Sequence, residues 1–377
     1  MYYKILSKIA QVIMGQSPPS LTYNTTGEGL PFFQGKADFG EMYPAPRVYC
    51  SEPNRIAEPG DILITVRAPV GPTNINRERS CIGRGLAAIR VGNNLDRDYL
   101  LYFLRFYEPE LAKTGTGSTF SAISRDDLET VKIPLPPLPE QQRIASLLTR
   151  ADRLRRLRRH ARELSGSLLQ SVFLEMFGDP KTNPKGWEVY ELGEVVKINP
   201  SGRLKVQAEQ PTSFLPMTLV DPSNTFSDTL DIKRFDEVST GYTYFEENDV
   251  LFAKITPCME NGNIVIAKNL LNGFGFGSTE FHVIRPNDTA NSFWLYELVK
   301  RMEFRQEATR WFRGTAGQQR VPNDFLESFR VPVPPLALQE QFAGVVARHE
   351  SLRRRQAESV RQAEGLFQSM LNEAFRG

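Results

Sequence analysis

The stretch PLPPLPEQQRI (134–144) returns 198 residues further along the chain as PVPPLALQEQF (332–342). The match between the two copies continues without a gap to the end of the chain. Identical residues at this offset include Gln141 and Gln339, Leu154 and Leu352, and Leu168 and Leu366. Self-similarity over so many positions indicates a duplicated structural element, so this repeat decides how the chain is organised.

Both copies have the periodicity of an amphipathic helix. Apolar residues recur at steps of three, four and seven: Ile144, Leu147, Ala151, Leu154, Ala161 and Leu168 in the first copy, and Phe342, Val345, Leu352, Ala363 and Leu366 in the second. Each copy begins with prolines and then continues for about forty residues without another. The pattern predicts two long helices, each roughly 55–60 Å long if unbroken, with a bend or break expected at Ser165-Gly166-Ser167 and at Gly365.

A weaker repeat precedes each helix. GDILITVRAPVG (60–71) resembles NDVLFAKITPCMENG (248–262), which places Asp61 opposite Asp249 and Arg67 opposite Lys254. Both segments read as a short apolar strand that ends in a Pro/Gly turn. A second strand, LAAIR (86–90) or FHVIR (281–285), follows in each block, and then a helix with aromatic residues, expected over 96–113 and 290–312. GFGFG (273–277) is expected to form a turn before the second of these strands.

These patterns together predict an α+β protein with an internal pseudo-twofold repeat. Two mixed α/β blocks, 1–133 and 179–333, are separated by two long helices, 134–178 and 334–377. Because a helix with one apolar stripe needs a partner, we expect the helices to pack against each other as an antiparallel coiled coil.

Composition excludes several classes of protein. The 377 residues are 40% hydrophobic and 24% charged, as in ordinary globular proteins, and without a long apolar segment or secretory signal the protein is expected to be cytoplasmic. The three cysteines and three histidines are dispersed, so no metal site is expected. The chain lacks a phosphate-binding loop and the Pro-Pro-aromatic tetrapeptide of amino-methyltransferases. It therefore reads as a protein without catalytic activity or cofactor of its own.

Several of these segments together carry a family resemblance. GLPFFQGKADFG (29–40), the turn at 60–71, STFSAIS (118–124) leading into the first proline motif, and the second proline-helix copy resemble the specificity subunit of type I restriction-modification enzymes. The resemblance covers essentially the whole chain, although Leu338 stands where the first copy has Glu140.

The resemblance implies a division of labour. The two blocks would be target recognition domains, each reading one half of an asymmetric, bipartite site in double-stranded DNA. The two helix segments would be the family's conserved spacer helices, which set the separation of the half-sites and dock two modification subunits. Those partners would supply S-adenosylmethionine-dependent adenine methylation, and separate restriction or motor subunits would supply ATP- and Mg-dependent translocation and cleavage. No membrane partner is implied.

Arg, Lys, Gln and Asn side chains on polar loops are suited to reading base edges or contacting phosphates. The candidates for DNA binding are Gln34, Lys36, Arg67, Arg77, Arg79 and Arg84 in the first block and Lys254, Arg310, Arg313, Gln318, Gln319 and Arg320 in the second. The candidates for the subunit interface are Gln141, Ile144, Leu147 and Leu154 with their counterparts Gln339, Phe342, Val345 and Leu352. Each single DNA candidate could instead be a solvated surface residue.

The segment 149–162 contains seven arginines in fourteen positions. A solvated coiled-coil face is the first interpretation, and DNA steering or an acidic partner surface is the alternative.

Two further functions of the chain stay open. One is a stand-alone metal-dependent nuclease, with Asp221, Asp231 and Lys233 as possible site residues, or a stand-alone methyltransferase; the other is a protein-only scaffold.

Overall fold

The computed structural model describes residues 2–115, 122–166, 168–202, 206–227, 229–315 and 317–376. Residues 118–121 of the STFSAIS segment and Ser167 lie outside this description. The chain forms two compact units. Unit 1 contains Met1–His160 and Glu358–Gly377, and unit 2 contains Ala161–Ala357. Both units combine helices with sheets, so the predicted α+β fold class is confirmed.

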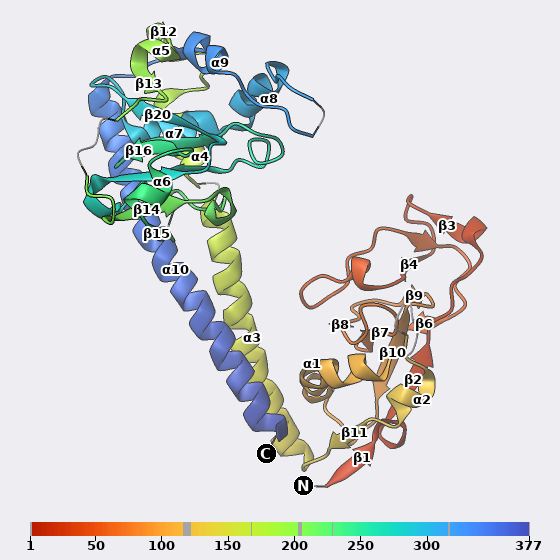
Figure 1. The fold of residues 1–377 in the computed structure, drawn as a ribbon. Coiled ribbons are helices and arrows are strands. Elements are labelled where there is room, and N and C mark those ends of the chain that lie inside the picture. The colour runs from red at the N-terminus through yellow and green to blue at the C-terminus, as the bar shows by residue number, and fades with distance from the viewer. Residues whose placement is uncertain are drawn as a thin grey trace. The chain divides into compact units, whose positions relative to one another are not determined.

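The first block has three sheets (Figure 1). Its strands are β1 (Tyr3–Ile5), β2 (Ala10–Met14), β3 (Tyr23–Asn24), β4 (Leu30–Phe33), β5 (Tyr49–Cys50), β6 (Ile56–Ala57), β7 (Ile62–Thr65), β8 (Thr73–Ile75), β9 (Ser80–Ile82), β10 (Leu86–Val91) and β11 (Lys132–Pro134). The orders are β1-β11, β2-β10-β7-β8 and β3-β5-β4-β9-β6. Among the described residues of this block, two α-helices complete it, α1 (Arg97–Thr114) and α2 (Arg125–Glu129). The expected strands at 60–71 and 86–90 and the helix at 96–113 are present as β7, β10 and α1.

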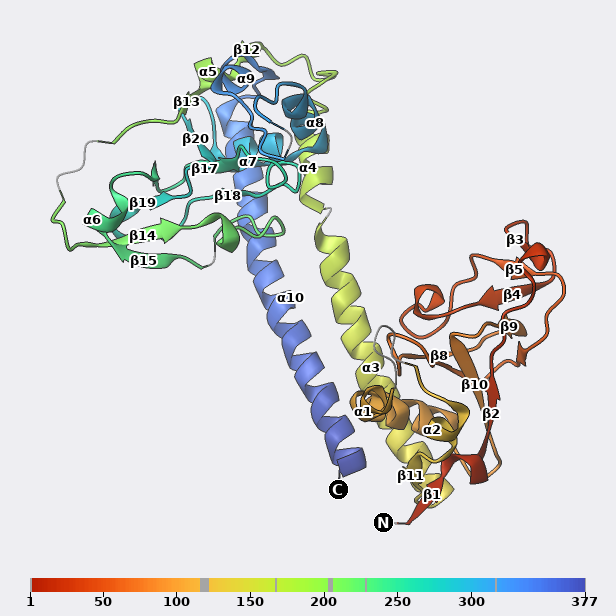
Figure 2. The ribbon, with the colours of Figure 1, turned by 45° about the vertical axis from the view of Figure 1, so that its right-hand side comes forward.

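The second block repeats this arrangement (Figure 2). Its strands are β12 (Val189–Glu191), β13 (Val196–Ile198), β14 (Pro211–Leu215), β15 (Asp231–Arg234), β16 (Thr243–Glu246), β17 (Val250–Ala253), β18 (Ile264–Ile266), β19 (Phe274–Gly277), β20 (Phe281–Pro286) and β21 (Arg330–Pro332). The orders are β12-β21, β13-β20-β17-β18 and β15-β14-β19-β16. In both blocks the third sheet contains one parallel pair, β4 with β9 and β14 with β19.

Short helices connect or cover these strands in the second block. They are α5 (Leu192–Val195), α6 (Phe235–Val238), α7 (Ser292–Lys300), α8 (Met302–Arg310) and α9 (Asn323–Ser328). The prediction of one helix over 290–312 was wrong, because Arg301 between α7 and α8 has extended backbone angles. The Arg301 side chain is buried and lies over the Phe173 ring, which gives this interruption a packing role.

The glycine-rich segment at 273–277 forms strand β19 rather than the expected turn. Its Phe and Gly residues alternate, as the two faces of a strand do. A Cβ on Gly275 would lie 2.9 Å from the Ser213 carbonyl oxygen and 2.8 Å from the Phe245 ring. Glycine is therefore required for close packing within this sheet.

The same buried ion pair supports the central sheet of each block. Asp61 precedes β7 and binds Arg90 of β10 through two hydrogen bonds of 2.9 and 2.8 Å. Asp249 precedes β17 and binds Arg285 of β20 through two hydrogen bonds of 2.7 Å. Asp61 and Asp249 are 3% and 1% exposed. Each carboxylate therefore fastens the start of one strand to the end of its neighbour.

Asp249→Ala is expected to lower the free energy of unfolding of unit 2 by about 1.5–3 kcal/mol, because it removes the two charge-assisted hydrogen bonds to Arg285, which then keeps only its ion pair with Glu246 at 2.9 Å. Urea unfolding followed by circular dichroism measures this loss. Asp231→Ala is the matched control, since Asp231 is exposed on β15, and its effect should stay within about 0.5 kcal/mol. Equal effects of the two substitutions would contradict the structural role of the pair.

The two proline motifs lead into the helices α3 (Leu138–Gly166) and α10 (Leu336–Arg376). A further helix, α4 (Leu168–Phe177), follows α3. The second copy is thus one helix that continues through Gly365, where a bend or break was expected, whereas the first copy is described as two helices that flank Ser167. Among the described residues, every helix is too short or too polar to span a lipid bilayer.

Within unit 1, the C-terminal part of α10 packs on α1 and α3. The Phe375 ring lies 5.3 Å from the Tyr99 ring, and the Phe367 ring lies 6.0 Å from the Tyr102 ring. The Arg155 guanidinium on α3 donates to the Glu364 carboxylate on α10 over 2.8 Å. These contacts place the first block, α3 and the end of α10 in one hydrophobic core.

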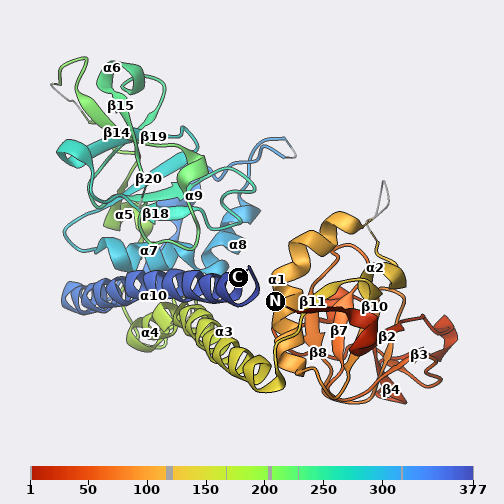
Figure 3. The ribbon, with the colours of Figure 1, turned by 90° about the horizontal axis from the view of Figure 1, so that it is seen from below.

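Within unit 2, α4 and the N-terminal part of α10 pack on the second block. Phe173 and Phe177 of α4 stack edge to face with Phe342 of α10, at centroid distances of 5.7 and 5.3 Å. Helix α7 lies between α10 and the central sheet (Figure 3). Its Trp294 is buried in the same core as Phe342. The helices therefore belong to the cores of the units and do not merely connect two domains.

Candidate nucleic-acid interface

Three candidates of the first block come from loops that the backbone holds together. The Gly83 amide donates to the Phe33 carbonyl over 2.8 Å, and the Val66 amide donates to the Gly85 carbonyl over 3.0 Å. Gln34 follows Phe33, Arg84 follows Gly83, and Arg67 follows Val66. All three side chains are exposed. The ends of β4, β7 and β9 thus present Gln34, Arg67 and Arg84 as one polar cluster, which we call the first loop cluster.

The other three candidates of the first block lie in neighbouring loops and have partners of their own. Lys36 is exposed in a short turn of 3-10 helix, and its ammonium group lies 5.9 Å from the centre of the Phe39 ring. The Arg77 guanidinium stacks 3.6 Å from the centre of the Tyr43 ring. Arg79 lies 3.4 Å from Glu58. Arg77 and Arg79 are exposed on the loop between β8 and β9 and are not part of the first loop cluster.

The second block brings its candidates together by the same kind of backbone pairing. The Val321 amide donates to the Lys254 carbonyl over 2.9 Å, and the Thr256 amide donates to the Gln319 carbonyl over 3.0 Å. Arg313 and Arg320 exchange two backbone hydrogen bonds of 3.0 and 2.9 Å. We call Lys254, Arg313, Gln318, Gln319 and Arg320 the second loop cluster.

Acidic residues from other elements partly neutralise this second loop cluster. Arg320 forms two hydrogen bonds of 2.9 and 2.7 Å with Glu280, and these bonds lower the pKa of the Glu280 carboxyl. Arg313 donates to Asp324 over 2.9 Å. Arg310, at the end of α8, donates to Glu307 over 2.6 Å and is exposed. The loop 310–320 itself contains no acid, so only the tertiary structure places Glu280 and Asp324 beside its arginines, whereas Glu307 lies one turn before Arg310 on α8.

The pairing of Arg67 with Lys254 across the two blocks was wrong by one residue. The Lys254 amide donates to the Glu280 carbonyl, and the Lys254 carbonyl accepts from the Val321 amide. In the same way, the Val66 amide donates to the Gly85 carbonyl, and the Val66 carbonyl accepts from the Ile123 amide. Lys254 thus matches the buried Val66 rather than the exposed Arg67. Its side chain is half-buried, and burial lowers the pKa of its ammonium group. Burial also lowers the pKa of the neighbouring His282 to about 4.

Three of the residues predicted for the subunit interface are buried inside the chain. Gln141 and Gln339 are 1% and 0% exposed, and every polar atom of their side chains has a partner within its own unit. Phe342 is 0% exposed in the core of unit 2. Their assignment to a partner surface was wrong, because the repeat that singled them out reflects a shared internal contact.

The apolar residues of the other helix face remain accessible. Leu147, Leu154 and Leu352 are 41%, 42% and 55% exposed, and Ile144 and Val345 are half-buried. Leu168 and Leu366, two residues of the predicted apolar stripe, are also exposed, and so are Leu157 and Leu164, which the repeat did not single out. We call the exposed leucines of each helix its leucine face: Leu147, Leu154, Leu157 and Leu164 on α3, Leu168 on α4, and Leu352 and Leu366 on α10.

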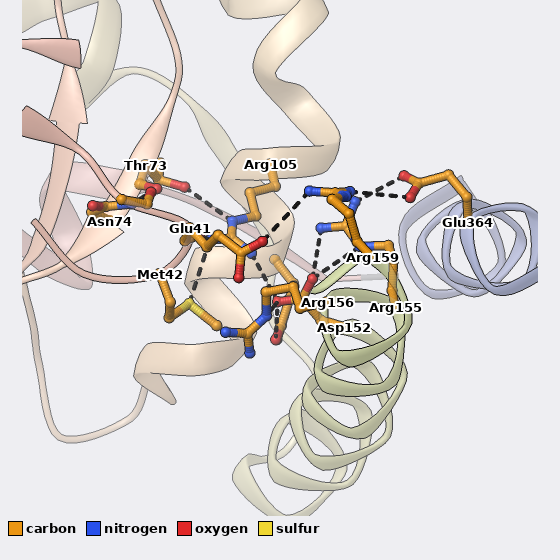
Figure 4. A network of polar contacts seen from close by, with 12 residues as sticks. Glu41, Met42, Thr73, Asn74, Arg105, Asp152, Arg155, Arg156, Arg159 and Glu364 are labelled. Carbon is orange, nitrogen blue, oxygen red and sulfur yellow. Dashed lines mark hydrogen bonds and ion pairs between the residues drawn. The ribbon is translucent and has the colours of Figure 1, made fainter. Parts of the chain in front are cut away.

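At least three of the seven arginines in the run 149–162 do not belong to a solvated face. Arg155 and Arg156 lie 2.6 and 3.3 Å from Asp152, which is 0% exposed (Figure 4). Arg158 donates to the Ser359 carbonyl of α10 over 2.9 Å. Arg150 and Arg153 are exposed. The run thus divides into residues that hold unit 1 together and residues that flank the leucine face.

The residues considered for a nuclease site do not gather. The Asp221 carboxylate accepts a hydrogen bond of 2.8 Å from the Ser223 amide within a turn, whereas Asp231 and Lys233 lie on β15. Within the described ranges, no three His, Cys, Asp or Glu side chains are grouped so that they could hold a metal ion.

Comparisons with known proteins agree with this arrangement of two similar blocks. A family model described as "Type I restriction modification DNA specificity domain" matches residues 6–163 and 184–358. The chain is 48% identical over 157 residues to the putative type I restriction enzyme MjaX specificity subunit of Methanocaldococcus jannaschii, covering 41% of this chain and 37% of the relative. It is 40% identical over 159 residues to the type I restriction enzyme EcoAI specificity subunit of Escherichia coli, covering 42% and 27%. These alignments thus span about a third of the relatives' length.

One solved structure matches nearly the whole chain. The S subunit of a type I restriction-modification system from M. genitalium superposes with a TM-score of 0.61 over 99% of this chain and 96% of that one, at 13% identity. At this identity the match concerns the fold alone. Since the family model covers nearly all of both blocks and the first part of each helix segment, the chain belongs to the family of type I restriction modification DNA specificity domains.

Proposed function

We propose that the chain is the non-catalytic specificity subunit of a type I restriction-modification system. Residues 1–133 and 179–333 act as target recognition domains, each reading one half of an asymmetric, bipartite site in double-stranded DNA. Residues 134–178 and 334–377 act as spacer helices. The observation that carries this proposal is the duplication of the central sheet, β2-β10-β7-β8 and β13-β20-β17-β18, with a polar loop cluster in each copy.

The loop clusters have the chemistry that such reading requires. Arg and Lys can donate to guanine O6 and N7, and Gln can pair with adenine N6 and N7. The first loop cluster supplies Gln34, Arg67 and Arg84, and the second supplies Gln318, Gln319 and Arg320. Lys36, Arg77, Arg79, Lys254, Arg310 and Arg313 are proposed to contact phosphates, which fixes position without reading sequence.

The helices are proposed to form an antiparallel coiled coil that relates the two copies by a pseudo-twofold repeat. Contacts of α3 with the end of α10 in unit 1, and of α4 with its beginning in unit 2, support antiparallel packing. Half-sites about one helical turn apart, roughly 34 Å, suit two readers joined in this way.

The leucine face is proposed to dock two modification subunits. Leu147, Leu154 and Leu352 are exposed although they continue an apolar stripe, and Arg150 and Arg153 are exposed beside it on α3. A partner helix with an apolar ridge flanked by acidic residues would complement this face. The partners would hold S-adenosylmethionine, and separate restriction or motor subunits would hold ATP and Mg²⁺.

Methylome sequencing of a strain that carries this chain with its modification subunit tests the proposal. The expected result is a methylated motif with two defined parts and a fixed gap. Methylation or cleavage by this chain alone, with S-adenosylmethionine or Mg²⁺, would instead support a stand-alone enzyme.

Arg84→Ala is expected to weaken DNA binding by about 1–3 kcal/mol, because a donor to a base edge or phosphate is removed from the first loop cluster. Fluorescence anisotropy of the complex with the modification subunits, on DNA carrying the methylated motif, measures the change. Lys132→Ala is the matched control, since Lys132 is an exposed cation on β11 outside the loop clusters. A loss of equal size in both variants would remove Arg84 from the interface.

A further inference from the structure

Each helix copy is held to its block by a glutamine in the proline motif. The Gln141 side-chain oxygen accepts a hydrogen bond of 2.9 Å from the Asp96 amide, and its nitrogen donates to the Asn94 and Pro136 carbonyls over 3.2 and 2.8 Å. Asp96 is the N-cap residue of α1, whose carboxylate also accepts from the Tyr99 amide. The side chain thus joins the first turn of α3 to the first turn of the block's main helix.

The second copy repeats these three hydrogen bonds. The Gln339 oxygen accepts from the Asn291 amide over 2.8 Å, and its nitrogen donates to the Thr289 and Pro334 carbonyls over 3.0 and 2.8 Å. Asn291 is the N-cap residue of α7, as Asp96 is of α1. One contact is therefore built twice, at equivalent positions of the two repeats.

A buried acid lies at a second equivalent position, eleven residues further along each helix. Eleven residues make about three turns and roughly 16 Å, and they return to within about 20° of the same helix face. Asp152 is 0% exposed and Glu350 is 5% exposed. Both acids therefore face the block on the same side of the helix as the glutamine.

These acids also bind residues of the block. Asp152 lies 3.3 Å from the Arg105 guanidinium of α1, and Arg155 and Arg156 of α3 complete its surroundings (Figure 4). Glu350 accepts a hydrogen bond of 2.8 Å from the Thr225 hydroxyl. Arg353, which lies 3.3 Å from Glu350, donates to Asn224 over 2.8 Å. The glutamine contact is the same in both units, whereas the contact of the buried acid uses different residues of the block in each unit.

We propose that Gln141 with Asp152, and Gln339 with Glu350, are positioning residues that fix each recognition block on its helix at two points. The block and its helix also share a hydrophobic core, but apolar packing is not directional, whereas two polar contacts on one helix face fix both the angle of the block and its position along the helix. Because Arg105 and the Asp96 amide both belong to α1, the first block is held through a single rigid helix. The consequence for DNA, which rests on the proposed function, is that these residues restrict the gap between the half-sites.

Distance measurement within unit 1 tests the anchor without DNA. Spin labels are attached in Glu52→Cys and Ser146→Cys, which are exposed positions on the first block and on α3. Cys258→Ser removes the partly accessible native thiol, and Cys50 and Cys81 are buried. Double electron-electron resonance is expected to give one narrow distance population in this background.

Gln141→Met and Asp152→Asn are each expected to add a second distance population, and the double variant to increase it. Gln142→Met is the matched control, because Gln142 is exposed beside Gln141, and it should keep the single population. Asp152→Glu keeps a carboxylate and introduces the residue type found at this position in the second copy. It should therefore show the single distance population of the background rather than the two populations of Asp152→Asn. A single, unchanged population in the double variant would overturn the proposal.

Methylation of a DNA library with varied gaps, by the complex with the modification subunits, tests the consequence. The anchor variants should methylate the same two half-sequences, now also at gaps shorter and longer by about one base pair. If wild-type chain shows no bipartite motif, the proposed function fails, while the distance measurement still decides the anchor. If the anchor variants broaden the spin-label distances but still methylate only sites with the wild-type gap, the link between the anchor and the gap would be overturned.

Discussion

Exchange of the first block for that of a relative is expected to change one half of the methylated motif completely and to leave the other half and the gap unchanged. Each block has its own central sheet, its own buried Asp-Arg pair and its own loop cluster. The first block can therefore be replaced without removing a residue from the second block's core.

The structure defines where the junction of this exchange should lie. Strand β11 ends at Pro134 and pairs with β1, and the Leu135 amide donates to the Tyr2 carbonyl over 2.8 Å. The exchanged segment is therefore extended from 133 to 135, so that both strands come from one parent. Gln141 stays with the recipient, because its partners on the block are backbone groups.

Methylome sequencing of the exchanged strain measures the outcome. The reciprocal exchange of the second block is the matched control and should change only the other half of the motif. A change of both halves by either exchange would rule out two independent readers.

Leu147→Asp together with Leu154→Asp is expected to weaken binding of the modification subunit by about a thousandfold. Removal of a central apolar side chain from an interface costs about 2 kcal/mol or more, and 1.4 kcal/mol corresponds to about a factor of ten. Both side chains are about two-fifths exposed in the chain, so the substitutions should not disturb the core of unit 1. The melting temperature of the double variant should stay within about 2 °C of wild type.

Isothermal titration of the purified chain with its modification subunit measures this loss. Gln142→Asp is the matched control, because Gln142 is exposed on α3 but lies about 120–140° around the helix from Leu147 and Leu154. Retained binding by the leucine variant would place the docking surface elsewhere on the chain.

Much of the fold could be predicted because its determinants are local. Apolar residues at helical spacing predicted the two long helix segments that contain α3 and α10, which begin at Leu138 and Leu336 within the proline motifs. Short apolar runs that end in turns predicted β7, β10, β17 and β20. The helix at 290–312 could not be predicted correctly, because the extended backbone at Arg301 accompanies a tertiary contact with Phe173 rather than a helix-breaking residue.

The candidate DNA residues show the limit of such reasoning. Their exposure was expected from the polarity of their loops, and most of them are exposed. Lys254 is the instructive exception, because its position by alignment matched an exposed arginine while its backbone pairing matches the buried Val66. A shift of one residue along a strand reverses the side of the sheet that a side chain faces.

By itself, the sequence determined the duplication, the two types of block and the positions at which each repeat must be alike. Helical and strand periods depend on backbone geometry, which is the same wherever a segment lies. The tertiary structure alone decided which of those repeated residues face inward: Gln141 and Gln339 hold blocks to helices, while Leu154 and Leu352 remain exposed. It also decided that Glu280 and Asp324 neutralise arginines of the second loop cluster. Such pairings join residues far apart in the chain, and they depend on how strands and helices pack, which no local pattern records.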